Sequence, residues 1–279
     1  MDFLLLARVL LHRRATFRRR EKWTRERLDQ YRARALGKLR AFAYARSRFY
    51  RKKHAGLFDA PLEALPAITK RELMESFDAV VTDPRVSLAA AREYLESNAK
   101  AKFLGRYQVA RTAGTTGFPA LFVSNPVEWA TTVASYERSQ RWAGIHASLL
   151  NHTPLALVSS GVMWHQSNRV GASVSSPFIT VERFDANEPM SEIVAGLNAA
   201  QPANLIAYAS MARLLADEQL AGRLQISPRA VMATSEVLSE EGARLIERAW
   251  GSPPFNVYAT TDASPPASHP SSMRLRASR

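Results

Sequence analysis

Hydrophobic and polar positions follow two different periods along this chain. Between residues 21 and 54, apolar side chains recur every three or four residues among many Arg and Lys residues, which predicts helix. From about residue 103, short apolar runs alternate with stretches of helical spacing. The runs predict buried strands, and the stretches predict the helices that connect them. We therefore expect an α/β protein with a helical N-terminal region followed by a large mixed, mostly parallel sheet.

The individual elements can be read from the same pattern. Thr69 has the spacing of a helix N-cap with Glu72, and it opens a short helix through Phe77. The sequence predicts strands at 107–110, 121–124, 155–158, 178–181, 205–208, 230–234 and 255–258. It predicts helices at 126–142, 191–200, 210–221 and 239–250.

Three regions follow from this organisation. We expect a basic helical N-terminal region at 1–70, an α/β domain at 71–262 and a disordered tail at 263–279. Eleven of the 17 residues in the tail are Ala, Ser or Pro, and none is acidic. Because the tail starts directly after a strand and a turn, its texture suggests a longer sequence that has been interrupted or read out of frame.

Charge is distributed very unevenly. The net charge is +13, yet residues 1–53 alone hold 18 Lys/Arg against 4 Asp/Glu. We interpret this segment as a solvated pair of helices, with binding to a polyanion or a membrane surface as an alternative. The apolar start at 1–11 contains Arg8 and is too short to span a bilayer, so we expect no transmembrane segment. The lack of cysteine excludes disulfides and thiolate metal sites and fits a cytoplasmic protein.

The segment 111–119, Arg-Thr-Ala-Gly-Thr-Thr-Gly-Phe-Pro, is the strongest candidate for chemistry. It follows a predicted strand, and two glycines bracket two threonines. Glycine lets backbone N–H groups approach an anion closely, and threonine hydroxyls donate further hydrogen bonds. Such a loop suits the phosphates of a nucleotide, although a plain turn has the same composition.

Three segments together resemble the adenylate-forming enzymes. Residues 112–119 look like their Ser/Thr/Gly-rich phosphate loop, and 258–262, Tyr-Ala-Thr-Thr-Asp, look like their Tyr-Gly-x-Thr-Glu signature. Between these, 234–239 resemble the Gly-Gly-Glu-x-Leu-Ser segment of the adenine pocket. Within the superfamily, phenylacetate-CoA ligase-like and coenzyme F390 synthetase-like proteins are the most similar, through 42–51 and 65–73.

The resemblance implies a ligase that works in two steps. A small carboxylic acid attacks ATP, with Mg²⁺ as cofactor, to give an acyl-adenylate, and a thiol such as coenzyme A then displaces AMP. Catalysis would consist mainly of positioning and of electrostatic stabilisation of phosphoryl oxygens. The implied partners are the acid and these cosubstrates, and no specific nucleic acid.

The resemblance also assigns roles to particular residues. Tyr258 would stack on adenine next to Ser235 and Glu236. Thr261 would contact the α-phosphate, and Asp262 would bind Mg²⁺. The phosphates would be held by Thr112, Gly114, Thr115, Thr116 and Gly117.

The chain departs from the family pattern in several places. Phe118 replaces a common Lys, Ala113 replaces Ser, and Asp262 replaces Glu. The family's ribose-binding Asp and late catalytic Lys have no counterpart after Asp262. We therefore expect a C-terminally truncated ligase that lacks the small C-terminal domain and has little activity. The alternative is a non-catalytic remnant or binding module of the same fold.

Other chemistry-bearing side chains give weaker signals. His165 is interpreted as an ordinary loop or pocket-wall histidine. The aromatic residues Trp129, Tyr136 and Trp142 recur at helical spacing, which is more typical of a hydrophobic core than of a substrate cage.

Overall fold

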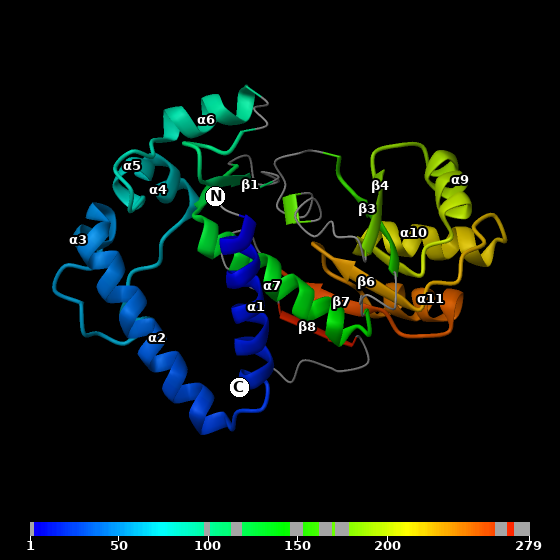
Figure 1. The fold of residues 1–279 in the computed structure, drawn as a ribbon, viewed down its shortest axis with the longest axis horizontal. Helices are drawn as coiled ribbons and strands as arrows, with labels where there is room; N and C mark the ends of the chain where they lie inside the picture. The colour runs from blue at the N-terminus through cyan, green and yellow to red at the C-terminus, as the bar shows by residue number, and fades with distance from the viewer. Residues whose placement is uncertain are drawn as a thin grey trace. The chain divides into compact units, whose positions relative to one another are not determined.

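A computed structural model describes residues 3–97, 101–112, 119–145, 153–161, 169–170, 179–259 and 267–270 (Figure 1). The chain divides into two compact units. The first is formed by residues 15–126, and the second by residues 127–279 together with the start of the first helix, up to Arg14. The border expected after residue 70 lies inside the first unit.

The helical segment predicted at 21–54 forms two helices, α2 (Arg25–Arg46) and α3 (Arg48–Lys53). The break lies at Ser47, which is fully buried. Its hydroxyl accepts a hydrogen bond from the backbone N–H of Tyr50 at 3.4 Å and donates one to the carbonyl of Ala79 at 2.9 Å. Ser47 therefore caps α3 and fixes it against a later helix, which a continuous helix would not allow.

Part of the positive charge of this unit has a structural use. No residue of α2 is buried, as expected for a solvated helix. Its Arg40, however, donates hydrogen bonds to the carbonyl oxygens of Leu57, Phe58 and Ala60. The guanidinium group therefore holds the loop after α3 against α2, because its fork of donors satisfies several carbonyl groups at once.

The capping box predicted from Thr69 and Glu72 is confirmed at the start of α4 (Lys70–Glu75). The Thr69 hydroxyl accepts from the Glu72 N–H at 3.2 Å, and the Glu72 carboxylate accepts from the Thr69 N–H at 2.9 Å. A hydrogen bond from Lys53 at 2.6 Å, helped by the Thr69 N–H, lowers the pKa of Glu72 to about 2. The remaining helices of this unit are η1 (Leu62–Ala64), α5 (Phe77–Val80) and α6 (Leu88–Glu96).

The second unit is built on a six-stranded sheet with the order β4-β3-β5-β6-β7-β8. The first five strands in this order are parallel, which confirms the mostly parallel sheet expected from the sequence. The strands are β3 (Thr153–Ser159), β4 (Ile179–Asp185), β5 (Asn204–Tyr208), β6 (Ala230–Thr234), β7 (Phe255–Tyr258) and β8 (Ala267–Pro270).

Helices cover both faces of this sheet. The helices α9 (Met190–Ala200), α10 (Ala209–Leu220) and α11 (Glu240–Trp250) pack on one face (Figure 1). The opposite face is turned toward α7 (Pro126–Trp142). Alternate residues of each strand point to opposite faces, so every strand contributes to both layers. The main core includes Val158, Ile193, Leu197, Leu205, Ala207, Leu215, Val231 and Ile246.

The N-terminal helix α1 (Phe3–Arg20) begins in the second unit. Its Leu10 packs against the cluster formed by Trp129, Val133 and Val170. Arg14 adds an ion pair with Glu137 of α7. The first part of the basic segment is therefore attached to α7. No helix among the described residues is long and apolar enough to cross a bilayer.

The last strand differs from the expectation for residues 263–279. The sequence predicted a disordered tail, whereas Ala267–Pro270 forms β8 and pairs antiparallel with β7. An edge strand leaves a row of backbone donors and acceptors unpaired, and even a short extended segment can satisfy them. Composition alone does not show that such an edge is within reach.

Candidate functional site

Thr112 closes a β-hairpin loop in the first unit. The strands β1 (Gln108–Arg111) and β2 (Leu121–Ser124) pair antiparallel. Just beyond the last pair, the N–H of Thr112 donates to the carbonyl of Ala120 at 3.0 Å, and the N–H of Ala120 donates to the Thr112 hydroxyl at 2.9 Å. The hydroxyl oxygen is only an acceptor here, so its own proton can still be donated to a ligand.

The other predicted phosphate-binding residues lie in this loop. Gly114, Thr115, Thr116 and Gly117 are outside the described residues. Their segment is bounded by Thr112 and Ala120, which the two hydrogen bonds above hold together. The preceding strand ends at Arg111, in agreement with a loop that directly follows a strand.

The carboxyl edge of the sheet holds the described residues predicted for the adenine pocket. Thr234 ends β6 and is buried, and Ser235 and Glu236 follow it at the surface. Tyr258 ends the neighbouring strand β7, and 70% of its surface is exposed. Ligands of open parallel sheets bind outside the carboxyl ends of the strands. Because its ring is so exposed, Tyr258 can stack on a planar ligand without moving core residues.

Ser235 has a backbone conformation that L-residues rarely adopt, with φ at +67°. The similar segment of adenylate-forming enzymes has glycine at this position. Glycine adopts positive φ at no steric cost, whereas serine stores strain in it. Ser235 therefore holds this turn at an energetic cost.

Two hydrogen bonds connect the segments at this edge. The Glu236 carboxylate accepts from the backbone N–H of Ser210 at 2.8 Å, at the start of α10. The Tyr208 hydroxyl accepts from the backbone N–H of Ser160 at 3.0 Å, so the end of β5 is connected to the segment after β3. Glu236 therefore stabilises a helix N-terminus, in addition to any contact with adenine.

Asp185 fixes the segment that follows β3. Its carboxylate accepts hydrogen bonds from the N–H of Asn187 at 3.0 Å and from the N–H of Gly161, and these bonds hold its pKa below the ordinary value. A Cβ atom added at Gly161 would lie 2.3 Å from Asp185 Oδ2. A side chain at position 161 would therefore displace the Asp185 carboxylate from this position.

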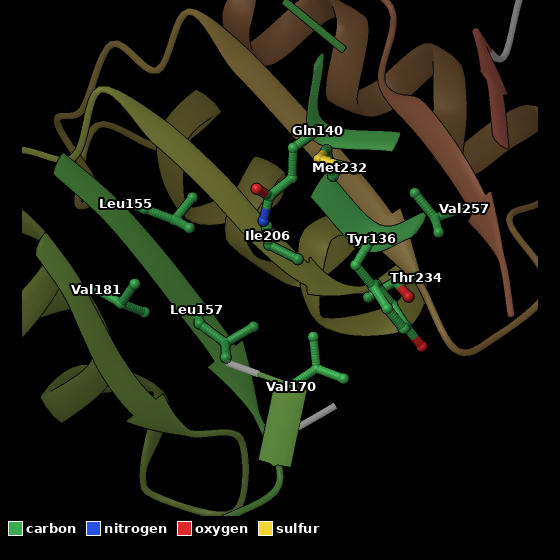
Figure 2. A pocket seen from close by; sticks show the side chains of 10 residues that line it. All are labelled: Tyr136, Gln140, Leu155, Leu157, Val170, Val181, Ile206, Met232, Thr234 and Val257. Atoms are coloured by element: carbon green, nitrogen blue, oxygen red, sulfur yellow. The ribbon is translucent and has the colours of Figure 1, made fainter. Parts of the chain in front are cut away.

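A pocket lies between α7 and the sheet face turned toward it (Figure 2). The space inside it is about 640 Å³, open solvent at the mouth included. Tyr136 and Gln140 line it from α7, one helical turn apart. Its other described lining residues are Leu155, Leu157, Val170, Val181, Ile206, Met232, Thr234 and Val257.

The chemistry of the pocket follows from these side chains. No described lining residue carries a charge, and most are aliphatic. Polar groups come only from Tyr136, Gln140 and Thr234 among the described lining residues. Such a surface accepts an uncharged, apolar group, because an unpaired charge would lose its hydration here.

Several predicted residues lie outside the described part of the chain. These are Thr261 and Asp262 of the second signature and also His165. Among the described residues, no group of three or more His, Asp or Glu side chains could hold a metal ion. Asp262 stays the predicted Mg²⁺ ligand.

The aromatic residues of α7 have different surroundings, and Trp142, whose spacing also predicted a core position, is exposed instead. Trp129 is buried in the cluster with Leu10, as expected for a core residue. Tyr136, which was assigned to the core from its spacing, also lines the pocket, and sequence reasoning missed Gln140. The available signal was their i, i+4 spacing, which places both side chains on one face of the helix.

The fold has clear counterparts among solved structures, although no protein-family model and no curated protein matches the sequence. A 2-hydroxyisobutyryl-CoA ligase bound to 2-HIB-AMP and CoA, in the thioesterification state, superposes with a TM-score of 0.66 at 20% identity. The match covers 88% of this chain and 52% of that chain. The chain shares the fold of about half of this acyl-CoA ligase.

A second structure of the same ligase, in an open conformation, supports this assignment. It superposes with a TM-score of 0.60 at 17% identity and covers 82% of this chain and 49% of the ligase. The chain thus spans about half the length of the ligases that it matches. The fold expected from the three short motifs is confirmed.

Proposed function

We propose that this chain provides the nucleotide- and acid-binding part of an adenylate-forming ligase that activates a small carboxylic acid with ATP. The observation that supports it is an uncharged pocket along the sheet face that leads to Thr234, directly before Ser235 and Glu236. This arrangement would place an acyl chain in the pocket and its carboxylate next to a nucleotide at the carboxyl edge of the sheet.

The proposed reaction has two steps. A carboxylate oxygen attacks the α-phosphorus of ATP, the bond to the bridging oxygen breaks, and pyrophosphate leaves. The sulfur of coenzyme A then attacks the acyl carbonyl carbon, AMP leaves, and the thiol proton goes to solvent. The protein contributes orientation and hydrogen-bond donors for phosphoryl oxygens.

Residues of this chain would have distinct parts in these steps. Thr112 and the loop glycines and threonines would bind the phosphates, and Thr261 would contact the α-phosphate. Tyr258 would stack on the adenine ring. Asp262 would hold Mg²⁺, whose positive charge offsets the negative charge of the phosphates.

Isotope exchange between pyrophosphate and ATP tests the proposal. The purified chain is given ATP, Mg²⁺ and, one at a time, a panel of aliphatic and aromatic carboxylic acids. Because the chain has no counterpart of the late catalytic Lys, we expect weak exchange that depends on one class of apolar acid and that falls further in Tyr258→Ala. Exchange that is absent with every acid, while ATP still binds in calorimetry, would instead indicate a non-catalytic binding module of the same fold.

A further inference from the structure

Gln140 brings a carboxamide group into a pocket that is otherwise mostly aliphatic. The residue lies on α7, one turn after Tyr136, and is partly buried. Figure 2 shows its side chain reaching from the helix toward the strands that form the pocket floor. Within the described part of the chain, its carboxamide has no hydrogen-bond partner. Its donor and acceptor are therefore available to whatever occupies the pocket.

The floor beneath Gln140 cannot satisfy this group. Leu155, Leu157 and Ile206 present only hydrocarbon to the pocket, and Met232 adds a thioether. Water can solvate the amide while the pocket is open. A ligand that fills the pocket with hydrocarbon alone would remove this water and leave a buried amide unpaired, which is unfavourable.

The position of Gln140 along the pocket defines which part of a ligand it would meet. Thr234 is the last residue of β6, at the carboxyl edge, whereas Met232 lies two residues deeper along the strand. In Figure 2, Tyr136 lies on the side of Thr234, and Gln140 lies toward Met232. With the reacting carboxylate at the carboxyl edge, Gln140 faces a remote part of the acyl chain.

We propose that Gln140 makes this site select carboxylic acids whose apolar chain has a hydroxyl or carbonyl group remote from the carboxylate. The inference rests on the proposed function, because it places the acyl chain in this pocket. A neutral carboxamide can donate to a carbonyl oxygen and can both donate to and accept from a hydroxyl. A second charge on the substrate would meet no opposite charge among the described lining residues.

Matched pairs of acids test this selection. Hexanoate is compared with 6-hydroxyhexanoate, and phenylacetate with 4-hydroxyphenylacetate. Binding of each acid is measured by calorimetry with a non-hydrolysable ATP analogue present, and pyrophosphate exchange is measured in parallel. In one pair or both, we expect the hydroxylated acid to bind at least about 10-fold tighter, because a site built for a hydrogen bond rejects the analogue that lacks it.

Gln140→Leu keeps the size of the side chain and removes its polar atoms. We expect this variant to lose the roughly 10-fold preference or to reverse it. The control is Gln30→Leu, the same change at an exposed position of α2 in the other unit. That variant should keep the wild-type preference.

The outcomes separate this inference from the proposed function. If exchange occurs but wild type and Gln140→Leu discriminate equally, or if wild type prefers the hydrocarbon acids, the inference is overturned and the ligase function stands. A shifted binding preference without exchange supports the inference and counts against catalysis. If no acid of either pair binds, the inference is overturned.

Discussion

The Glu236 carboxylate accepts a hydrogen bond from the backbone N–H of Ser210 at 2.8 Å, which joins the end of β6 to the start of α10. Tyr208 is the N-cap residue of α10, but its side chain makes no capping hydrogen bond. Glu236 therefore serves as a cap from a distant part of the sequence, and its replacement should destabilise the second unit.

We expect Glu236→Ala to lower the free energy of unfolding by about 1 kcal/mol, as for other lost helix caps. Glu236→Gln retains an oxygen acceptor and should lose only the charge interaction with the helix N-terminus, about 0.5 kcal/mol. Urea unfolding followed by circular dichroism measures both. Equal stability of Glu236→Ala and wild type would show that the hydrogen bond contributes nothing.

Replacing Ser235 with glycine should increase the stability of the folded chain. A non-glycine residue with left-handed backbone costs about 1–2 kcal/mol, and the extra freedom of glycine in the unfolded chain returns about 0.5–1 kcal/mol of that. We expect the stability order Ser235→Gly above wild type above Ser235→Val in thermal unfolding. If Ser235→Val is as stable as wild type, the positive φ carries no strain.

Tyr258 offers a test of nucleotide binding that leaves the core intact. Because its ring is largely exposed, Tyr258→Ala should change stability by less than about 0.5 kcal/mol. It should weaken ATP binding roughly 10-fold through the lost stacking, and Tyr258→Phe should retain most of the affinity. Calorimetric titration with ATP distinguishes the variants. Unchanged ATP affinity in Tyr258→Ala would argue against stacking at this residue.

The Thr112 hydroxyl helps to hold the two ends of the hairpin loop together. Thr112→Ala removes the acceptor for the Ala120 N–H, at a cost of about 1 kcal/mol, while Thr112→Ser retains it. Hydrogen exchange at the Ala120 amide should therefore become faster in Thr112→Ala and change little in Thr112→Ser. Similar exchange rates in both variants would mean that the β1–β2 pairing alone closes the loop.

Lowering the pH should reduce the stability of the first unit, because Glu72 becomes protonated. The pKa of Glu72 is about 2 in the folded chain, below its ordinary value of 4.5, mainly because Lys53 donates to its carboxylate. This contribution to stability is complete above about pH 4.5 and is lost as the pH falls toward 2. Urea midpoints measured between pH 6 and pH 2 should show this decline in wild type.

Two variants isolate the contribution of Glu72. Glu72→Gln cannot ionise, so its urea midpoint should start lower and vary less with pH. Glu75→Gln changes an exposed carboxylate on the same helix and should keep the wild-type decline. If the midpoint of Glu72→Gln falls with pH as steeply as that of wild type, the decline has another origin.

The central elements of the second unit could be predicted from sequence because each has a local signal. The runs 230–234 and 255–258 are short and apolar, and both form strands with the predicted bounds. Helix 126–142 is also found with its predicted bounds, since proline begins it and its apolar residues keep a helical period. Such signals depend only on neighbours in the chain.

The features that sequence analysis missed depend on distant contacts. The helix α6 was not predicted, because only Ala91 and Leu95 are buried on it and alanine gives a weak pattern. No local pattern shows that Gln140 faces the same pocket as Leu155 and Ile206. Those residues meet only after two crossovers place their strands side by side.

The helix α7 divides two tasks between neighbouring turns. Trp129 and Val133 hold it to Leu10 and Val170, whereas Tyr136 and Gln140 line the pocket. Tyr136 also packs against this anchoring cluster, so of the two pocket positions on α7 it is Gln140 that can change without loosening the anchor. If the pocket holds the acyl chain as proposed, a library randomised at position 140 alone would change the preferred acid while the helix stays anchored.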